Sequence, residues 1–207
     1  LYARLQRKGY LRRDCERLVN QDRNIFGGLL LQLGQGDAMI TGVTRTYAQA
    51  MRQVRRVIDP LPGRKPFGIH IIVGQAHTLF IADSTVNERP SPEDLADIAE
   101  HTAHVARRMG HEPRVAFLSY STFGNPEGEW LENIRNAVSE LDRREVGFEY
   151  EGEMSPDVAL NPKQLANYPF ARLSGPANVL VMPGLQSANI SAKLLREVSG
   201  DSTIGPM

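Results

Sequence analysis

The sequence contains a single cysteine, Cys15, and this scarcity excludes two kinds of stabilising site. No disulfide can form within the chain, and no zinc site can be built on several cysteines. We therefore expect Cys15 to be a small buried apolar residue rather than a reactive thiol. Acidic and basic residues are equally numerous, 24 of each, so the formal net charge is zero. Without an excess of positive charge, we expect no nucleic-acid partner and no anionic-membrane partner.

Long apolar runs and several well-known catalytic motifs are also missing. No apolar stretch approaches the roughly 18 residues that a membrane-spanning helix needs, and the chain shows no signal peptide. The phosphate-binding loop, the glycine-rich dinucleotide fingerprint and the serine nucleophile elbow do not occur. The first residue, Leu1, lies in a charged helical pattern. We therefore expect a piece of a longer cytoplasmic protein.

The first sixty residues have mostly helical patterns. Residues 1–26 show helical spacing among many arginines, 26–33 predicts a buried helix, and 47–58 predicts an amphipathic helix. A short strand is expected at 38–41. Three prolines and a glycine within 59–66 cannot continue a helix and predict a linker. The sequence therefore predicts a domain boundary near 60–66.

Beyond this linker, short apolar runs alternate with amphipathic helical patterns. One helix start is well marked, because Ser91 can cap it, Pro92 suits its first position, and Glu93 and Asp94 lie at its positive end. This alternation predicts an α/β fold with a largely parallel sheet and helices on both faces. The expected strands are 69–73, 78–82, 115–119, 147–150 and 178–182, and the expected helices are 91–109, 127–144, 162–167 and 186–199.

The loop 120–125 follows an expected strand and is a candidate anion site. It contains Ser121, Thr122 and Gly124. Small residues between a strand and a helix supply backbone N–H groups that can hold an anion. The same residues also form ordinary caps and turns, so both interpretations stay open.

A second candidate anion site precedes and enters the 47–58 helix. Thr44, Arg45 and Thr46 lie at its positive end, and Arg52 lies in its second turn. The planar guanidinium of arginine suits a phosphate or a carboxylate. A solvated basic face is the alternative, because two more arginines follow at 55–56.

Acidic residues and histidines give weaker signals. Glu149, Glu151, Glu153 and Asp157 could hold a metal or act as a base, but ordinary loop acids explain them better. The histidines show neither metal-ligand spacing nor a serine and aspartate partner. We expect no metal site. The histidines are His70, His77, His101, His104 and His111.

The last part of the chain predicts a ligand crevice. An apolar run over 179–182 breaks at Pro183 and Gly184 and turns into a helix that contains Asn189. In open α/β sheets, ligands bind at the carboxyl ends of the strands. Short motifs in this segment and elsewhere follow one another in order along nearly the whole chain: FGG (26–28), GDAMITG (36–42), FIADS (80–84), VAFLSYS (115–121), EGE (151–153) with Asp157, ANVLVMP (177–183), ANI (188–190) and GP (205–206).

Together these motifs resemble the phosphate acetyltransferase (phosphotransacetylase) family. The resemblance implies two α/β domains, with 1–65 as a mostly helical part of the first and 66–207 as most of the second, which is inserted into it. It implies a cleft in which coenzyme A and acetyl phosphate meet. The family's thiol-activating residues follow the Gly-Pro motif, after which only Met207 remains here, so no catalytic residue is assigned. The expected ligand-binding residues are Thr44, Arg45, Thr46, Arg52, Ser121, Thr122, Asn189, Gly205 and Pro206.

Other segments resemble one branch, the phosphotransacetylase-like C-terminal domain of large bacterial NADP-dependent malic enzymes. They are RTY (45–47), VRRVIDP (54–60), RRMGHEPRV (107–115) and SGPAN (174–178). The resemblance implies an N-terminal part that converts malate to pyruvate with NADP and a divalent metal. It implies that this domain is regulatory, binds acetyl-CoA or coenzyme A, and belongs to a homo-oligomer.

Two other functions remain open. The chain could be an active phosphate acetyltransferase, which exchanges coenzyme A for phosphate on an acetyl group. It could also be an interaction module that only builds the oligomer. The regulatory function is favoured, because several segments are typical of the malic enzyme branch and because the arginine of a Leu-Arg pair in the family is displaced here, where the sequence reads Arg4-Leu5.

Overall fold

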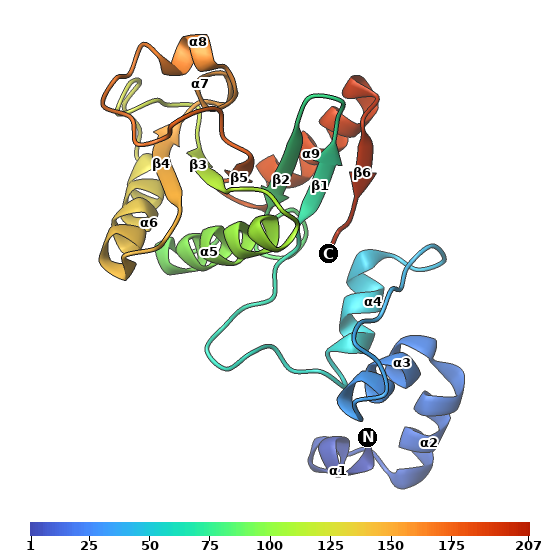
Figure 1. Ribbon diagram of the computed structural model, residues 1–207. Helices are drawn as coiled ribbons and strands as arrows, with labels where there is room; N and C mark the ends of the chain where they lie inside the picture. Colours follow the sequence, from blue (N-terminus) through green and yellow to red (C-terminus); the bar gives the residue numbers. More distant parts are fainter. The chain divides into compact units, whose positions relative to one another are not determined.

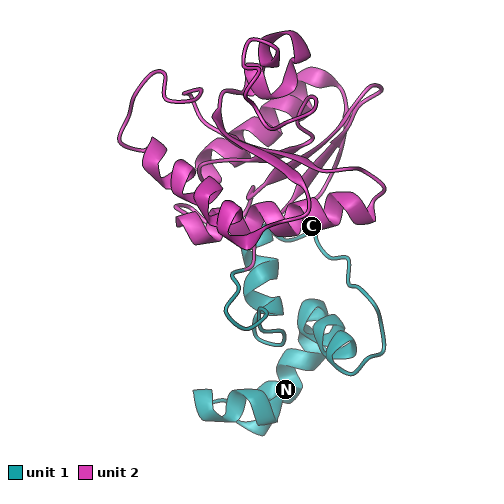
Figure 2. Cartoon of the chain, turned by 60° about the vertical axis from the view of Figure 1, so that its left-hand side comes forward, with its two compact units in different colours: residues 1–65 teal, residues 66–207 magenta.

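The computed structural model describes residues 1–207 and divides into two compact units, Leu1–Lys65 and Pro66–Met207. Figure 2 shows unit 1 in teal and unit 2 in magenta. The division falls within the proline-rich segment 59–66. No helix in the structure is both long enough and apolar enough to span a bilayer. The assignment of the units to a first and an inserted domain stays a prediction.

Unit 1 is helical, but the prediction of one helix over 1–26 is wrong. Gly9 interrupts it with a left-handed conformation, at a φ of +86°. Asp22 interrupts it again, because its backbone is extended and its carboxylate accepts hydrogen bonds from the backbone amides of Asn24 and Ile25. The elements are α1 (Tyr2–Leu5), the 3-10 helix η1 (Gln6–Lys8), α2 (Arg12–Gln21), α3 (Arg23–Gln32) and α4 (Tyr47–Val54).

In unit 1, the burial predicted from the sequence is correct for Cys15 and wrong for 26–33. Cys15 is buried as predicted, with 3% of its surface exposed. The segment 26–33 lies largely in α3 but is not a buried helix, because Phe26 and Leu33 are 50% and 70% exposed. An apolar run therefore marked the helix correctly but not its environment.

The strand predicted at 38–41 is absent. The backbone there has no regular structure, and the side chain of Thr41 instead donates a hydrogen bond to Asn24. Ile40 is fully exposed. A strand needs a neighbouring strand to pair its backbone groups, and unit 1 contains none.

Unit 2 is built on one six-stranded sheet with the order β4-β3-β5-β2-β1-β6 (Figure 1). The pairs β2–β5, β3–β5 and β3–β4 are parallel, and β1–β2 and β1–β6 are antiparallel. The strands are β1 (His70–Val73), β2 (Thr78–Ala82), β3 (Arg114–Leu118), β4 (Glu149–Met154), β5 (Val179–Val181) and β6 (Ser202–Ile204). The helices are α5 (Pro92–Arg108), α6 (Leu131–Arg144), α7 (Pro156–Leu160), α8 (Pro162–Leu165) and α9 (Leu185–Ser199).

The sheet is covered on both faces, as predicted. Residues along a strand alternate between the two cores, so Phe117 faces the first core while Leu118 faces the second. Helices α5 and α6 supply the first core, and α7, α8 and α9 supply the second. Both faces of the strands are thus apolar, which explains why their sequences read as continuous apolar runs.

All strands and helices expected in this unit are present, with shifted ends. Ser91 caps α5 as predicted: its hydroxyl accepts a hydrogen bond from the Asp94 amide, whose carboxylate accepts one from the Ser91 amide. Two elements were not expected, α7 and β6. The expected strand 147–150 is longer and displaced, because β4 runs from Glu149 to Met154.

Candidate functional site

One edge of the sheet collects the loops in which the sequence predicts a ligand. Strands β2, β5, β3 and β4 run in the same direction, and β6 joins them because both β2 and β6 are antiparallel to β1. Their carboxyl ends therefore lie at the same edge. The loops that leave this edge include 83–87, 119–125, 183–184 and 205–206. This is the edge at which open α/β sheets bind ligands.

Ser84, directly after β2, is the centre of one polar group at this edge. Its side chain is fully buried, and its hydroxyl donates a hydrogen bond to the carbonyl of Gly68 over 3.1 Å. His70 at the start of β1 brings Nδ1 to 2.6 Å from the same hydroxyl oxygen. Asn189 on α9 donates from its amide to the Ser84 carbonyl over 3.0 Å. Three separate elements thus converge on one serine.

The His70 imidazole in this group has a pKa below its ordinary value. Burial lowers its pKa first, and the positive charges of Arg196 and Lys193 lower it further. The Ser84 hydroxyl lies within hydrogen-bond distance of both Nδ1 of His70 and the Gly68 carbonyl, so the donor in the Nδ1 contact depends on the His70 tautomer.

Gly205 and Asn189, both predicted ligand residues, belong to this group. A methyl group on Gly205 would lie 2.6 Å from the carbonyl oxygen of Ile69 and 3.4 Å from the ring of His70. Pro206 follows, and Met207 then exchanges two backbone hydrogen bonds with Ile69. The sequence missed His70 and Ser84. The usable signal was the position of Ser84 immediately after a buried strand.

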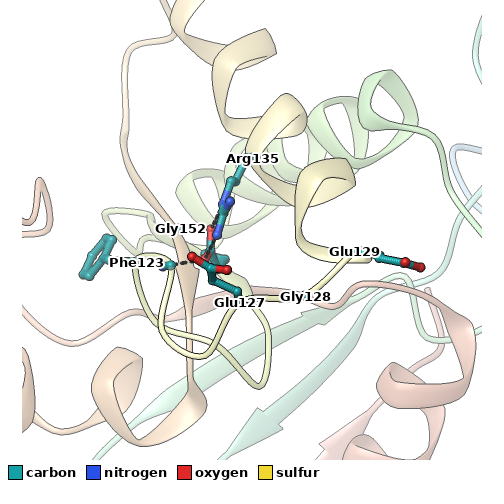
Figure 3. A pocket seen from close by; sticks show the side chains of 8 residues that line it. Phe123, Glu127, Gly128, Glu129, Arg135 and Gly152 are labelled. Atoms are coloured by element: carbon teal, nitrogen blue, oxygen red, sulfur yellow. Dashed lines mark hydrogen bonds and ion pairs between the residues drawn. The ribbon is translucent and has the colours of Figure 1, made fainter.

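A second polar group lies beyond β5 along the same edge and is centred on Glu153. This carboxylate is only 2% exposed. It accepts a bidentate pair from Arg135 on α6, over 2.8 and 2.9 Å, and a bond from the Gly124 amide over 2.8 Å. The Ser121 hydroxyl donates to it over 3.2 Å. An open hollow of about 870 Å³ surrounds the group, and Figure 3 shows Arg135 pointing into it.

A β-bulge gives Glu153 its position. Phe117 pairs with Gly152, and Leu118 pairs with Met154, so that Glu153 is the extra residue of β4. Because of the bulge, Glu153 has no paired residue on β3, and its side chain contacts Arg135 instead. Burial alone raises the pKa of Glu153, but the hydrogen bonds from Arg135 and the Gly124 amide outweigh it, and the pKa lies below its usual range.

This lowered pKa predicts a pH dependence of stability. A carboxylate whose pKa is lower in the folded than in the unfolded state stabilises the fold above its unfolded pKa. That stabilisation is lost as the pH falls below about 4.3 and through the folded value. We expect the free energy of unfolding to fall more steeply below this pH in the parent than in Glu153→Gln. Urea unfolding at several pH values checks this, and equal slopes would contradict it.

The acidic cluster 149–153 is not a set of ordinary loop acids, which corrects the sequence interpretation. It lies within β4, and Glu151 is only 5% exposed. Glu151 accepts hydrogen bonds from the backbone amide of Arg172 over 2.8 Å and from its guanidinium over 3.3 Å. Nowhere in the chain do three or more metal-ligating side chains gather. Glu151 and Glu153 thus each form an ion pair with an arginine, and Glu149 accepts hydrogen bonds from Ser174.

Ser121 and Thr122 form part of the Glu153 group, and their hydroxyls are used within the protein. The Ser121 hydroxyl bonds Glu153, and the Thr122 hydroxyl bonds the side chain of Ser155 over 2.9 Å. Thr122 also pairs with Asn125 through backbone hydrogen bonds, which makes the turn foreseen for this loop. In the sheet, β5 separates this group from Asn189 and Gly205. The ligand-binding role of these hydroxyls stays a prediction.

The four predicted ligand residues of unit 1 differ in what they contact. Thr46 caps α4 by accepting a bond from the Gln49 amide over 3.3 Å, and Thr44 accepts one from Arg23. Arg45 is engaged by Asp22 over 3.0 Å and by Gln53 over 2.6 Å. Arg52 is exposed on α4 and forms no ion pair within the chain. Of the four, Arg52 therefore offers the guanidinium most open to a ligand.

The family model for phosphate acetyl/butaryl transferases matches residues 1–207. The chain belongs to this family. A phosphotransacetylase from Streptococcus pyogenes has the same fold, with a TM-score of 0.88 and 29% identity over 99% of this chain and 64% of that one. The EutD phosphotransacetylase from Staphylococcus aureus gives a TM-score of 0.77 and 27% identity over 88% of this chain and 57% of its own.

Relatives of two kinds match in sequence. An NADP-dependent malic enzyme from Rhizobium meliloti is 55% identical over all 207 residues, which are 27% of its own length. A probable NADP-dependent malic enzyme from Rickettsia prowazekii is 46% identical over the whole chain and 28% of its length. A phosphate acetyltransferase from Clostridium acetobutylicum is 34% identical over the whole chain and 64% of its length. The chain thus spans about a quarter of the malic enzymes that it matches.

Proposed function

We propose that this chain is the phosphotransacetylase-like regulatory domain of an NADP-dependent malic enzyme and that it binds acetyl-CoA as an allosteric ligand. The 55% identity to the Rhizobium meliloti NADP-dependent malic enzyme over the full 207 residues carries this proposal. NADP and a divalent metal would be bound by the malate-oxidising part of the protein, outside these residues. A homo-oligomer and a cytoplasmic location belong to the same proposal.

Regulation would follow from thermodynamic linkage. If acetyl-CoA binds one arrangement of the assembly more tightly than another, it shifts the population toward that arrangement. The properties of the malate site change with this population. The size of the change is set by the difference between the free energies with which acetyl-CoA binds the two arrangements. No chemistry on acetyl-CoA is needed, and none of the residues assigned here has a catalytic role.

Two polar features support an anionic ligand. Arg52 is exposed and unpaired on α4, where its guanidinium can contact a phosphate group of the coenzyme. In unit 2, Asn189 and Gly205 lie beside His70, at the edge of the sheet where such folds bind ligands, and the positive charges of Arg196 and Lys193 act on this place. Removal of Arg52 therefore tests the proposal most directly.

We expect Arg52→Ala to weaken acetyl-CoA binding by about tenfold, because a charge-assisted hydrogen bond to phosphate contributes about 1.5–3 kcal/mol. In the full-length protein, the same substitution should relieve inhibition by acetyl-CoA and leave malate-dependent NADPH formation without effector nearly unchanged. Calorimetric titration of the chain and a spectrophotometric assay of the full-length protein measure the two effects.

The control is Arg55→Ala, which removes an exposed arginine one residue beyond α4. It should bind acetyl-CoA as the parent does. If Arg52→Ala and Arg55→Ala have equal affinities and equal inhibition, the placement of the ligand is wrong. If acetyl-CoA leaves malate turnover of the parent unchanged, the regulatory proposal itself is wrong.

An active phosphate acetyltransferase is the second candidate, and the 34% identity to the Clostridium acetobutylicum enzyme favours it. In that reaction the coenzyme A thiolate attacks the acetyl carbon of acetyl phosphate. A carbon–sulfur bond forms, the carbon–oxygen bond to phosphate breaks, and inorganic phosphate leaves. Formation of acetyl-CoA from coenzyme A and acetyl phosphate by the full-length protein would favour this candidate over regulation.

A further inference from the structure

A cavity of about 730 Å³ lies at the amino-terminal edge of the sheet, opposite the edge that carries Ser84 and Ser121. It is located where the central strands β2, β5 and β3 begin. Four segments that are distant in sequence line it: 74–79 at the turn between β1 and β2, His111 and Arg114 around the start of β3, Leu160 at the end of α7, and 176–178 before β5. Its volume is typical of small-molecule sites.

The walls of this cavity are held in place by Asn178. Its side-chain oxygen accepts a bond from the Arg114 amide over 2.8 Å, and its amide donates to the Glu112 carbonyl over 2.8 Å. Its backbone carbonyl accepts from the Phe80 amide over 2.8 Å. One residue thus joins the beginnings of β2, β3 and β5. A site with such fixed walls loses little conformational entropy when it binds a ligand.

The chemistry of the lining favours an anion. Arg114 donates from Nε to the Pro176 carbonyl over 2.7 Å, which orients the guanidinium and leaves its two terminal nitrogens without a protein partner. His111 stacks edge-on against Phe80 at 5.6 Å, and its ring nitrogens form no hydrogen bond within the chain. His77 also lines the cavity, with its Nε2 atom 3.5 Å from the carboxylate of Asp201, and no aspartate or glutamate is among the lining residues. The two terminal nitrogens of Arg114 are therefore available to donate hydrogen bonds to a ligand.

We propose that this cavity is a second ligand site, which binds a small metabolite through a carboxylate or phosphate group paired with Arg114. The two free terminal nitrogens of Arg114 suit such a group, because a guanidinium binds either anion through parallel hydrogen bonds. The imidazole of His111 contributes a further polar contact beside it. Leu79, Leu160 and Pro176 give the cavity an apolar wall for the rest of the metabolite. The cavity lies at the edge of the sheet opposite the one proposed to bind acetyl-CoA.

The test is a titration of the 207-residue chain with two probes, inorganic phosphate and succinate, followed by the NMR shifts of backbone amides. We expect at least one probe to shift the amides of His111, Arg114 and Asn178. A response to phosphate alone assigns a phosphate-bearing metabolite, and a response to succinate alone assigns a carboxylate. If neither probe moves these amides, or if only amides near Ser84 and Arg52 respond, the proposal is wrong.

Two variants and one control localise the binding. Arg114→Gln should weaken binding of the active probe by about tenfold or more, because it removes the charged fork. His111→Phe keeps the ring against Phe80 but removes its nitrogens, and should weaken binding to a smaller extent. Arg108→Gln, which removes an exposed arginine at the end of α5, should bind as the parent does. Equal affinities of Arg114→Gln and Arg108→Gln would overturn the proposal.

Discussion

Replacement of Asp83 by asparagine is expected to lower the free energy of unfolding of unit 2 by about 4 kcal/mol, a large effect for one substitution. Asp83 is only 3% exposed. Its Oδ1 atom accepts bonds from the amides of Gly68, Thr85 and Val86, and its Oδ2 atom accepts two bonds from Asn87. These bonds hold the residues before β1 to those after β2.

Asparagine has almost the same shape as aspartate but only one accepting oxygen. Its NH2 group would therefore take the place of one accepting oxygen. The buried N–H groups that bonded to this oxygen would then have no acceptor, and each of them costs about 1–3 kcal/mol. Urea unfolding followed by circular dichroism measures the total effect. Hydrogen exchange at the amides of Gly68, Thr85, Val86 and Asn87 shows whether the loss is local.

The control for Asp83→Asn is Glu129→Gln, which removes one carboxylate charge at an exposed position of the same unit. Its effect on the free energy of unfolding should stay within about 0.5 kcal/mol. An Asp83→Asn variant that is as stable as this control would show that the hydrogen bonds of Asp83 do not hold the loop together.

Gly152→Ala is expected to lower the free energy of unfolding by about 2–3 kcal/mol, through steric conflict in a filled core. A methyl group at this position would lie 2.7 Å from Cβ of Phe117 and 3.0 Å from its backbone oxygen. Phe117 is 1% exposed and cannot move without disturbing the first core. Either β4 separates from β3 or the bulge at Glu153 changes.

Gly147→Ala is the matched control, because nothing lies within 4 Å of a methyl group at that position. Thermal and urea unfolding of the two variants give the comparison. The amide resonance of Gly124, which donates to Glu153, should shift in Gly152→Ala and not in Gly147→Ala. Equal stability of the two variants would mean that β3 and β4 tolerate the added methyl group.

The central strands β2, β3 and β5 were predictable because each is buried on both faces, whereas the exposed edge strand β6 was missed. In β3, Val115 and Phe117 face the first core while Ala116 and Leu118 face the second, so every position is apolar and the run is easily found. The start of α5 was predictable for a different reason. A cap formed by Ser91 and Asp94 depends on residues three positions apart, and its chemistry is entirely local.

The polar groups at the carboxyl edge could be predicted only in part. A loop after a strand pointed to Ser121, and the family resemblance pointed to Asn189 and Gly205, but neither pointed to the residues that these side chains and backbone groups meet. Asn189 contacts Ser84 across 105 positions of sequence, and neither residue carries a pattern that names the other. The acidic run in β4 was misread for the same reason, because its arginine partners come from other elements.

The sequence by itself determined the α/β class, the start of α5 and the family resemblance, since apolar periodicity, capping and short motifs are all local properties. Tertiary structure decided which polar residues are used internally and which remain open. Arg45 is occupied by Asp22 and Gln53, Arg52 is exposed, and Arg114 keeps two nitrogens free. The physical reason is that an arginine can bind a ligand only through those N–H groups that no nearby carboxylate, amide or carbonyl already accepts, and such acceptors are brought near by the fold.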